Sequence, residues 1–407
     1  MGQTAGQPWA DGISAFTTLG IPPIEFGPGA FASLADRLPR FGRSLLLVRG
    51  ERSFQRLEQA RWLEALLGRL EVARQDVVVS GEPGPALVDE AVARFRPARI
   101  DVVLAIGGGS VIDAGKAIAA LLPSGDSVWE YLEEVGRGRT FEGVGCPIIA
   151  IPTTAGTGSE VTRNAVLSVP GPRGFKRSFR ADALVPRLAI VDPDLLATCP
   201  RPLIAADGLD ALTQLIEAYT SRRANPISDA IARRGLQASR DGLARWYDGA
   251  PADQARARAD AAFAALASGI ALAQAGLGAV HGLAAAIGGL YAVPHGVVCG
   301  VLLAPTTRVN LATLHARTPD APALARYAQV ACTLLPDRAA GDPGVLDDLP
   351  ALLQDLTVHL GMRGLAEWGV AARDIPRLIE LSRAGSMRTN PVDLTDEELT
   401  GILHSAL

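Results

Sequence analysis

The spacing of hydrophobic residues changes about halfway along the chain. In the first half, short apolar runs typical of buried strands alternate with segments of helical spacing. Strands that alternate with helices form parallel sheets covered on both faces, so this half predicts an α/β domain. The expected strands are residues 45–48, 77–79, 101–106, 147–151 and 188–191, and the expected helices are 86–95 and 111–122.

After Asp192 and Pro193 the pattern is helical throughout and rich in alanine and leucine. A last short helix is expected over 395–407, with Thr395 as N-cap and Glu398 completing a capping box. We therefore predict an α/β domain over residues 1–197 and an all-helical domain over 198–407. The other helices expected in the second domain are 205–219, 227–246, 253–275, 279–290, 321–335, 345–360 and 372–383.

Composition narrows the classes of function. The chain has 407 residues and a formal net charge of −4, which argues against a nucleic-acid partner. Its four cysteines are far apart and contain no CxxC pair, which favours a reducing compartment and disfavours a zinc cluster built from thiolates. Residues 1–12 lack the pattern of a secretion signal and are expected to form a tail, and no uninterrupted apolar run is long enough to cross a membrane. We expect a cytoplasmic protein, with a homodimer as the default assembly.

Three glycines and a serine, Gly107, Gly108, Gly109 and Ser110, separate an expected strand from an expected helix. Glycines allow close backbone approach, Ser110 is expected to cap the helix, and the N–H groups of a helix N-terminus attract phosphate. A tight turn alone would need only one glycine, so this glycine turn (residues 107–110) favours a pyrophosphate. It is not the GxGxxG fingerprint of a standard Rossmann domain.

A polar loop (residues 153–159) follows the expected strand 147–151 and carries four hydroxyl groups, those of Thr153, Thr154, Thr157 and Ser159. Ligands of open α/β sheets bind at the carboxyl ends of strands, where this loop lies. From the residues alone, a solvated loop is an equal alternative.

A group of metal-ligand residue types occurs in the helical half. Asp210 and Gln214 share one face of a helix, His281 begins a helix rich in glycine and alanine, and His295 is expected in a turn after that helix. A carboxylate, two imidazoles and an amide oxygen suit zinc or ferrous iron. Spacing alone leaves open that these histidines are ordinary core or surface residues.

Four segments, residues 107–119, 151–166, 207–219 and 278–296, together resemble the iron-containing (group III) alcohol dehydrogenase family in the family's order. The resemblance implies a dinucleotide-binding α/β domain and a helical metal-binding domain, with NAD or NADP between them. It also implies reversible hydride transfer between a small alcohol and its aldehyde or ketone.

By position, the resemblance implies roles for individual residues. Asp210, His281 and His295 match catalytic metal ligands, and Lys176 matches a lysine that contacts the cofactor. Gly107, Gly108, Gly109 and Ser110 would hold the pyrophosphate, with Asp113 just behind, and Thr153, Thr154, Thr157 and Ser159 would line the nicotinamide and ribose.

Two positions depart from the family pattern. Gln214 stands where the family has a fourth ligand, a histidine, and Ala285 replaces a second histidine that helps to move the proton. The amide oxygen of Gln214 can still bind a metal, and the proton would leave through water, a ribose hydroxyl or Tyr291. Alternatives left open are a metal-independent reductase resembling maleylacetate reductases, a sugar-phosphate cyclase-like lyase resembling dehydroquinate synthase, and a cofactor-binding protein without turnover.

The residues after the first long strand bear on the choice between NAD and NADP. A carboxylate at this point would repel a 2′-phosphate, and the chain has Gly50 there, flanked by Arg49 and Arg52. The sequence therefore predicts that NADP is tolerated, although both arginines could equally be solvated beside Glu51.

Overall fold

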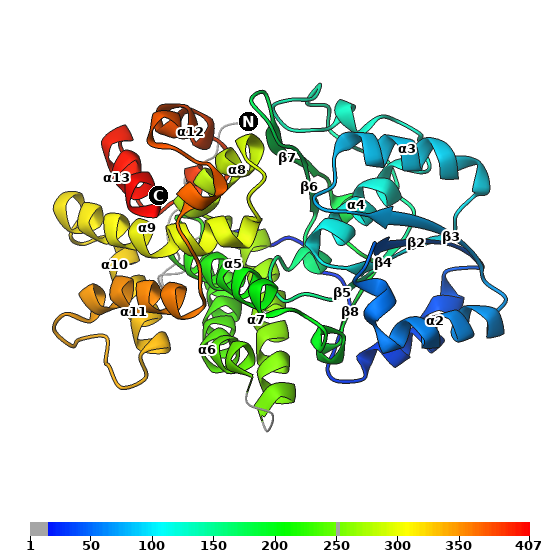
Figure 1. The fold of residues 1–407 in the computed structure, drawn as a ribbon, viewed down its shortest axis with the longest axis horizontal. Helices are drawn as coiled ribbons and strands as arrows, with labels where there is room; N and C mark the ends of the chain where they lie inside the picture. The colour runs from blue at the N-terminus through cyan, green and yellow to red at the C-terminus, as the bar shows by residue number, and fades with distance from the viewer. Residues whose placement is uncertain (1–14, 250–252) are drawn as a thin grey trace.

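The computed structural model describes residues 15–249 and 253–407, so the tail expected over 1–12 lies outside the described residues. An α/β domain and a helical domain lie side by side (Figure 1). All strands of the main sheet are parallel, which confirms the predicted fold class. The sheet has six strands in the order β1-β8-β5-β4-β2-β3, formed by Ile24–Phe26 (β1), Ser44–Gly50 (β2), Ala73–Val79 (β3), Val102–Gly107 (β4), Ile148–Pro152 (β5) and Leu188–Val191 (β8).

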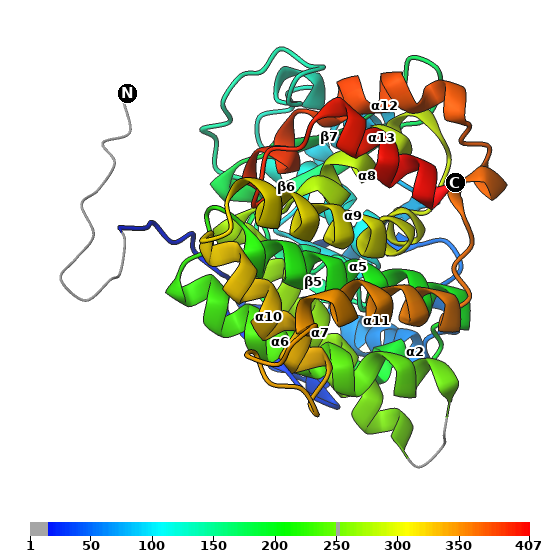
Figure 2. The ribbon, with the colours of Figure 1, turned by 90° about the vertical axis from the view of Figure 1, so that its left-hand side faces the viewer.

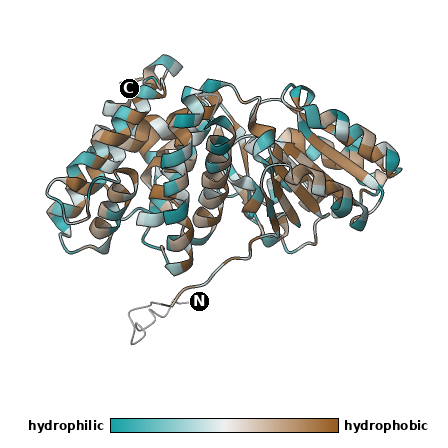
Figure 3. Cartoon of the chain, turned by 90° about the horizontal axis from the view of Figure 1, so that it is seen from below, coloured by the Kyte–Doolittle hydropathy of each residue, from teal (hydrophilic) through white to brown (hydrophobic). Residues whose placement is uncertain are grey.

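Alternate residues of each central strand pack on opposite faces of the sheet. Leu45 and Leu47 of β2 contact a core shared with α1 (Leu34–Arg37) and α2 (Glu58–Arg69). Leu46 and Val48 pack on the other face with α3 (Pro85–Phe95) and α4 (Gly109–Leu121). Because both faces are covered, the strands are almost continuously apolar, as their brown colour in Figure 3 shows.

The strand order reverses between β2 and β4. The chain passes from β2 outward to β3, then returns to place β4 on the other side of β2, with Arg49 opposite Ile106. Ligands of open α/β sheets bind beyond the carboxyl ends of the two strands at such a reversal. Here those ends are Gly50 and Gly107, so the topology places a binding edge at the glycine turn.

Some local predictions in the α/β domain need correction. Helix α4 begins at Gly109 after the N-cap Gly108, so the expected cap by Ser110 is wrong and Ser110 lies in the first helical turn. The extended backbone of Gly108 continues directly from β4, and the helix therefore starts two residues earlier than expected. The short β1, the helix α2 and an antiparallel hairpin of β6 (Asn164–Val169) and β7 (Phe175–Arg180) were not predicted.

The expected helices of the second domain are present. The capping box at its last helix is confirmed: the Glu398 N–H donates to Thr395 Oγ1 at 3.2 Å, and the Thr395 N–H donates to Glu398 Oε2 at 2.7 Å. The helices that match predictions are α5 (Arg201–Thr220), α6 (Pro226–Asp248), α7 (Gln254–Ala275), α8 (Ala279–Leu290), α10 (Pro322–Leu334), α11 (Val345–His359), α12 (Ile375–Ser382) and α13 (Asp396–Ala406).

One long helix, α9 (His295–Arg317), was missed, and the turn expected at His295 is wrong. Pro294 is the N-cap residue of this helix, and its extended backbone precedes the first turn. Helix α9 packs against α5, α8, α11 and α13 in the centre of the domain (Figure 2). It is long and apolar enough to cross a membrane, yet 72% of the relevant window is buried inside the protein, as in the core helix of a globular domain.

Main chain of the α/β domain lies against main chain of the helical domain at several glycines, among them Gly158 and Gly269. Gly158, in the polar loop after β5, adopts a left-handed backbone with φ of +60° and lies against Gly269 of α7. A methyl group on Gly158 would lie 2.5 Å from the Gly269 Cα, and one on Gly269 would overlap the Gly158 carbonyl oxygen. Glycine at both positions therefore sets how closely α7 approaches the loop.

We expect Gly269→Ala to lower the free energy of unfolding by about 1–3 kcal/mol, because the added methyl group forces backbone apart. Denaturant unfolding measures the change. Gly401→Ala is the matched control, because a methyl group at this exposed position of α13 meets nothing within 4 Å. It should stabilise the protein by about 0.5–1 kcal/mol. Equal effects of the two substitutions would contradict the tight contact.

Candidate active site at the domain boundary

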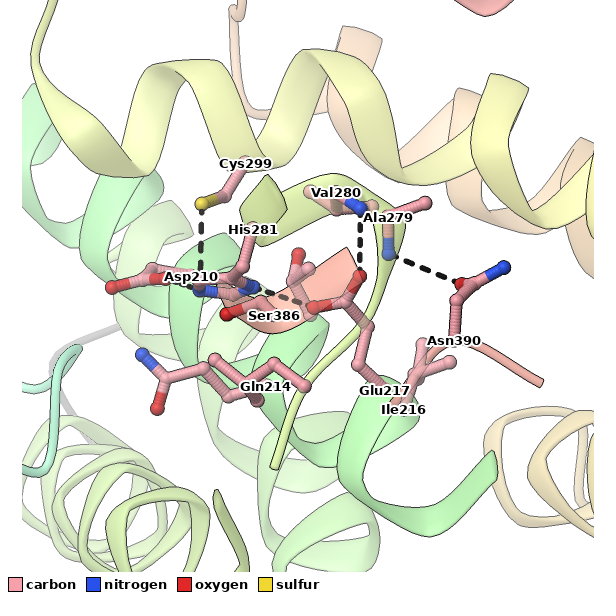
Figure 4. A network of polar contacts seen from close by, with 12 residues as sticks. Asp210, Gln214, Ile216, Glu217, Ala279, Val280, His281, Cys299, Ser386 and Asn390 are labelled. Atoms are coloured by element: carbon pink, nitrogen blue, oxygen red, sulfur yellow. Dashed lines mark hydrogen bonds and ion pairs between the residues drawn. The ribbon is translucent and has the colours of Figure 1, made fainter. Parts of the chain in front are cut away.

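Three of the predicted metal ligands converge on one point in the helical domain. Asp210 lies in the middle of α5, His281 in the first turn of α8, and His295 at the start of α9. The Asp210 Oδ1 atom is 3.2 Å from His281 Nε2 and 3.8 Å from His295 Nε2. We call these three residues the metal cluster; Asp210 and His281 are buried (Figure 4).

Glu217 holds one imidazole of the metal cluster in place. Its Oε2 atom lies 2.6 Å from His281 Nδ1, and its Oε1 atom accepts a hydrogen bond of 2.7 Å from the Val280 N–H. A ligand histidine commonly donates its second ring N–H to a carboxylate, which leaves the other nitrogen free for the metal. Glu217 was not predicted from the sequence, although it follows Asp210 by seven residues and so shares its helix face.

The electrostatics of the metal cluster favour a cation. Burial would raise the pKa of Asp210, but His295 and His281 lower this pKa well below its ordinary value. Burial, with the charge of Lys176, lowers the pKa of His295 to about 4, so this imidazole is neutral at neutral pH. Burial would also lower the pKa of His281, but the acidic groups around it raise that pKa well above its ordinary value. A metal ion would displace this proton, because ligation requires a neutral imidazole.

Gln214 lies one helical turn after Asp210, as predicted, but its amide oxygen faces away from the imidazoles. That oxygen accepts a hydrogen bond of 2.9 Å from Ser268 Oγ on α7. Ser268 Oγ also lies 3.4 Å from the Gly156 carbonyl oxygen in the polar loop. A chain of polar contacts thus links the α/β domain to Asp210, and metal binding by Gln214 stays a prediction.

The glycine turn and the polar loop, predicted separately, lie against each other. The Thr153 N–H donates to the Gly107 carbonyl oxygen at 3.0 Å, and a methyl group on Gly109 would lie 2.6 Å from Thr157 Oγ1. The contact with Thr157 therefore requires glycine at position 109, and close approach of a ligand there stays a prediction. The first N–H groups of α4 have no partner within the helix and are available to a phosphate.

The polar loop also contacts α5 close to the metal cluster. A methyl group on Gly156 would lie 2.8 Å from the Cβ atom of Asp207, a half-buried residue of α5. Burial, together with the nearby charge of Asp210, raises the pKa of Asp207 to about 7. The expected nicotinamide side and the expected metal side are thus in direct contact.

Asp113 and Ser159, both expected near the cofactor, are engaged inside the protein. Ser159 Oγ donates to Asp113 Oδ1, and the Val166 N–H donates to Asp113 Oδ2 at 3.0 Å. The fully buried Lys116 donates from Nζ to the carbonyl oxygen and to the hydroxyl of Ser159, each at 2.8 Å. This network fastens the end of the polar loop to α4, and cofactor contacts by Asp113 and Ser159 stay predictions.

Lys176 reaches the same boundary from β7. Its Nζ atom pairs with Glu82 Oε1 at 2.5 Å, and Glu82 Oε2 accepts a hydrogen bond of 2.7 Å from Ser168 Oγ. Its charge is close enough to lower the pKa of His295, so this lysine lies near the metal cluster. Whether it contacts a cofactor stays a prediction.

Comparison with known proteins identifies the family. The family model for iron-containing alcohol dehydrogenase matches residues 22–193, and the C-terminal model of the Fe-containing alcohol dehydrogenase family matches residues 204–407. The chain belongs to the iron-containing alcohol dehydrogenase family. The predicted family, and an oxidoreductase of the alcohol dehydrogenase class, are therefore confirmed.

Relatives in this family span the whole length of the chain. Alcohol dehydrogenase 4 of Saccharomyces cerevisiae is 32% identical over 400 residues, which cover 97% of this chain and 99% of that protein. A crystal structure of 1,3-propanediol oxidoreductase matches with a TM-score of 0.85 at 29% identity, covering 97% of this chain and 100% of that one. Sulfoacetaldehyde reductase from Bifidobacterium kashiwanohense, in complex with NAD+, matches with a TM-score of 0.79 at 27% identity, covering 96% and 98%.

We expect Glu217→Gln to weaken metal binding by about 10–100-fold, because the amide holds the His281 N–H less strongly than a carboxylate does. Competition with a chelator of known affinity measures the loss. Glu397→Gln, at an exposed position of α13, is the control and should leave metal affinity unchanged. Unchanged affinity in Glu217→Gln would mean that the carboxylate does not orient the imidazole.

Proposed function

We propose that the protein catalyses the reversible NAD- or NADP-dependent oxidation of a small alcohol to its aldehyde or ketone. The observation that carries the proposal is the convergence of Asp210, His281 and His295 where the polar loop contacts α5. The same loop packs on the glycine turn, at the strand reversal where α/β sheets bind ligands. Dinucleotide and metal positions would therefore face each other across one boundary.

A divalent ion, iron or zinc, fits the metal cluster, which combines a carboxylate with two imidazoles. When bound, the ion supplies Lewis acidity to the substrate oxygen, and the nicotinamide supplies the hydride acceptor. The chain itself holds His281 through Glu217 and excludes water by burying Asp210. The Cys299 thiol lies beside both imidazoles, and metal binding by the Gln214 amide oxygen stays a prediction.

The proton of the alcohol needs another route than the family's second histidine, because Ala285 stands at that position. The Tyr291 hydroxyl is held by Asp374, and burial with this hydrogen bond raises the pKa of Tyr291 to about 12. A phenol with this pKa is a poor proton acceptor at neutral pH. We therefore favour water or a ribose hydroxyl of the cofactor as the first acceptor.

Acceptance of NADP is part of the proposal. Gly50 ends β2 at the strand reversal and carries no charge that would repel a 2′-phosphate. Arg49 is engaged with Asp76 at 2.8 Å and lies over the Phe54 ring, whereas Arg52 is exposed and free to turn toward a phosphate. Arg52 is thus the better candidate for pairing with the phosphate.

We also propose a cytoplasmic location and a homodimer. All four cysteines are free thiols, which suits a reducing compartment. The dimer rests only on the general prevalence of twofold assemblies among soluble oligomers. Light scattering of the purified protein measures the assembly directly.

Removal of the metal should abolish turnover. Prolonged dialysis against a chelator is expected to reduce alcohol oxidation to background, and addition of zinc or ferrous iron should restore it, because the substrate oxygen loses its Lewis acid. Binding of NADH or NADPH, followed by fluorescence, is the control and should survive dialysis. Full activity without metal would instead support the reductase of the maleylacetate type.

A carboxylate at the end of β2 should discriminate between the cofactors. We expect Gly50→Asp to raise KM for NADPH relative to NADH by about tenfold or more, because repulsion of the 2′-phosphate costs at least about 1.4 kcal/mol. Steady-state kinetics with each cofactor measure the ratio. Gly68→Asp adds the same charge on the outer side of α2, where nothing lies within 4 Å of a methyl group, and should leave the ratio unchanged.

A further inference from the structure

A fourth potential ligand points into the metal cluster. Cys299 follows His295 by one turn of α9, so both side chains lie on the same helix face. The buried Cys299 Sγ is 3.6 Å from His295 Nε2 and 3.7 Å from His281 Nε2. One ligand atom from each of Asp210, His281, His295 and Cys299 lies within 4.8 Å of all the others. Figure 4 shows the thiol aimed at His281 and Asp210.

These separations are those of a metal coordination shell. A tetrahedral zinc ion with bonds of about 2.3 Å to sulfur and about 2.0 Å to nitrogen and oxygen keeps sulfur and nitrogen about 3.5 Å apart, and nitrogen and oxygen about 3.3 Å apart. The sulfur–nitrogen distances here are 3.6 and 3.7 Å, and the distances from Asp210 Oδ1 to His281 Nε2 and to His295 Nε2 are 3.2 and 3.8 Å. The four groups therefore need little movement to surround one ion.

Gln214 is oriented for a different task. Its amide oxygen accepts from Ser268 Oγ, and its amide nitrogen lies on the side of the Asp210 carboxylate in Figure 4. An amide nitrogen is a hydrogen-bond donor and offers no lone pair to a cation. To become a ligand, the amide would have to turn over and give up its contact with Ser268. Ser268 on α7 instead holds the amide oxygen away from the metal cluster.

Charge balance also favours the thiolate. Asp210 and two neutral imidazoles leave one positive charge on a divalent ion within its own ligand shell, because the Glu217 carboxylate contacts His281 and not the ion's position, and an amide ligand would not change that. A thiolate neutralises it, and burial of a net charge is costly in a protein interior. The thiol loses its proton to solvent as the ion binds, so that one sulfur–hydrogen bond is exchanged for one sulfur–metal bond with no change in oxidation state.

We propose that Cys299 is the fourth ligand of this site, in place of Gln214, and that its sulfur makes the site prefer zinc to iron. The preference follows because thiolates favour zinc, whereas carboxylate and imidazole ligands alone discriminate less. The proposal rests on the metal-dependent function proposed above. Cys299, one turn after His295 on α9, thus supplies the fourth ligand that Gln214 on α5 does not.

Cobalt reports the ligand directly, because thiolate coordination to Co²⁺ produces a charge-transfer band in the near ultraviolet that nitrogen and oxygen ligands do not produce. The metal-free protein, titrated with Co²⁺ alone, should bind one ion per chain and develop this band. Cys299→Ser should lose the band and bind cobalt more weakly by more than the 10–100-fold or so that loss of an outer-shell partner causes. Thermal unfolding of the metal-free variant checks that it is folded.

Matched variants separate Cys299 from other thiols and from Gln214. Cys146→Ser removes a thiol just before β5, and Cys332→Ser removes one on α10. Both variants should keep the band at full intensity. Gln214→Ala should also keep it. A band that persists in Cys299→Ser, or a wild-type protein that binds cobalt without the band or does not bind it at all, would overturn the proposal.

X-ray absorption of the zinc-loaded wild-type protein tests the same ligand without any substitution. One sulfur neighbour at about 2.3 Å is expected beside nitrogen and oxygen neighbours at about 2.0–2.1 Å. A shell of nitrogen and oxygen alone would exclude Cys299. Protein offered equal zinc and ferrous iron without oxygen should retain mainly zinc, and retention of mainly iron would contradict the preference.

The two proposals fail in different ways. A protein that shows the sulfur ligand but transfers no hydride between NAD(P) and any alcohol or aldehyde would keep the ligand assignment and lose the proposed function. A protein that is active only with metal but shows no sulfur ligand would keep the function and lose Cys299.

Discussion

The burial of opposite charges at the junction of three helices is the constraint on which the site depends. Asp210 and Glu217 face His281 from the same side of α5, inside a core that is rich in alanine and leucine. A carboxylate without a partner in such a place would cost several kcal/mol, so α5, α8 and α9 have to meet there.

The second constraint is contact between the two domains. A hydride can pass only between a dinucleotide and a substrate held at a defined distance, and each is expected on a different domain. Among the contacts that cross the boundary, one runs from Gly156 through Ser268 to Gln214, and another joins Gly156 to Asp207. Both end on α5 within a turn of Asp210, so the polar loop and the carboxylate are held as one unit.

Much of this architecture could be predicted from the sequence, because parallel strands buried on both faces are apolar runs and long helices repeat every 3.6 residues. The hairpin strand Phe175–Arg180 carries too many basic residues to be recognised, and α9 was hidden by a proline and a glycine beside His295 that signal a turn locally. The family resemblance predicted Asp210, His281 and His295 as metal ligands, and their side chains do converge. Because α9 was not predicted, the four-residue spacing from His295 to Cys299 could not indicate a shared helix face. The role of Glu217 could not be predicted either, because it depends on the packing of α8 against α5.

The glycine pair at the domain boundary has a consequence for how such an enzyme can change. Gly158 and Gly269 contact each other through their main chains. The distance between the polar loop and α7 is therefore set by backbone atoms alone and does not depend on any side-chain rotamer. Substitutions that reshape the surrounding pocket therefore leave this spacing as it is. Substrate range can diverge while the alignment of the reacting partners is inherited unchanged.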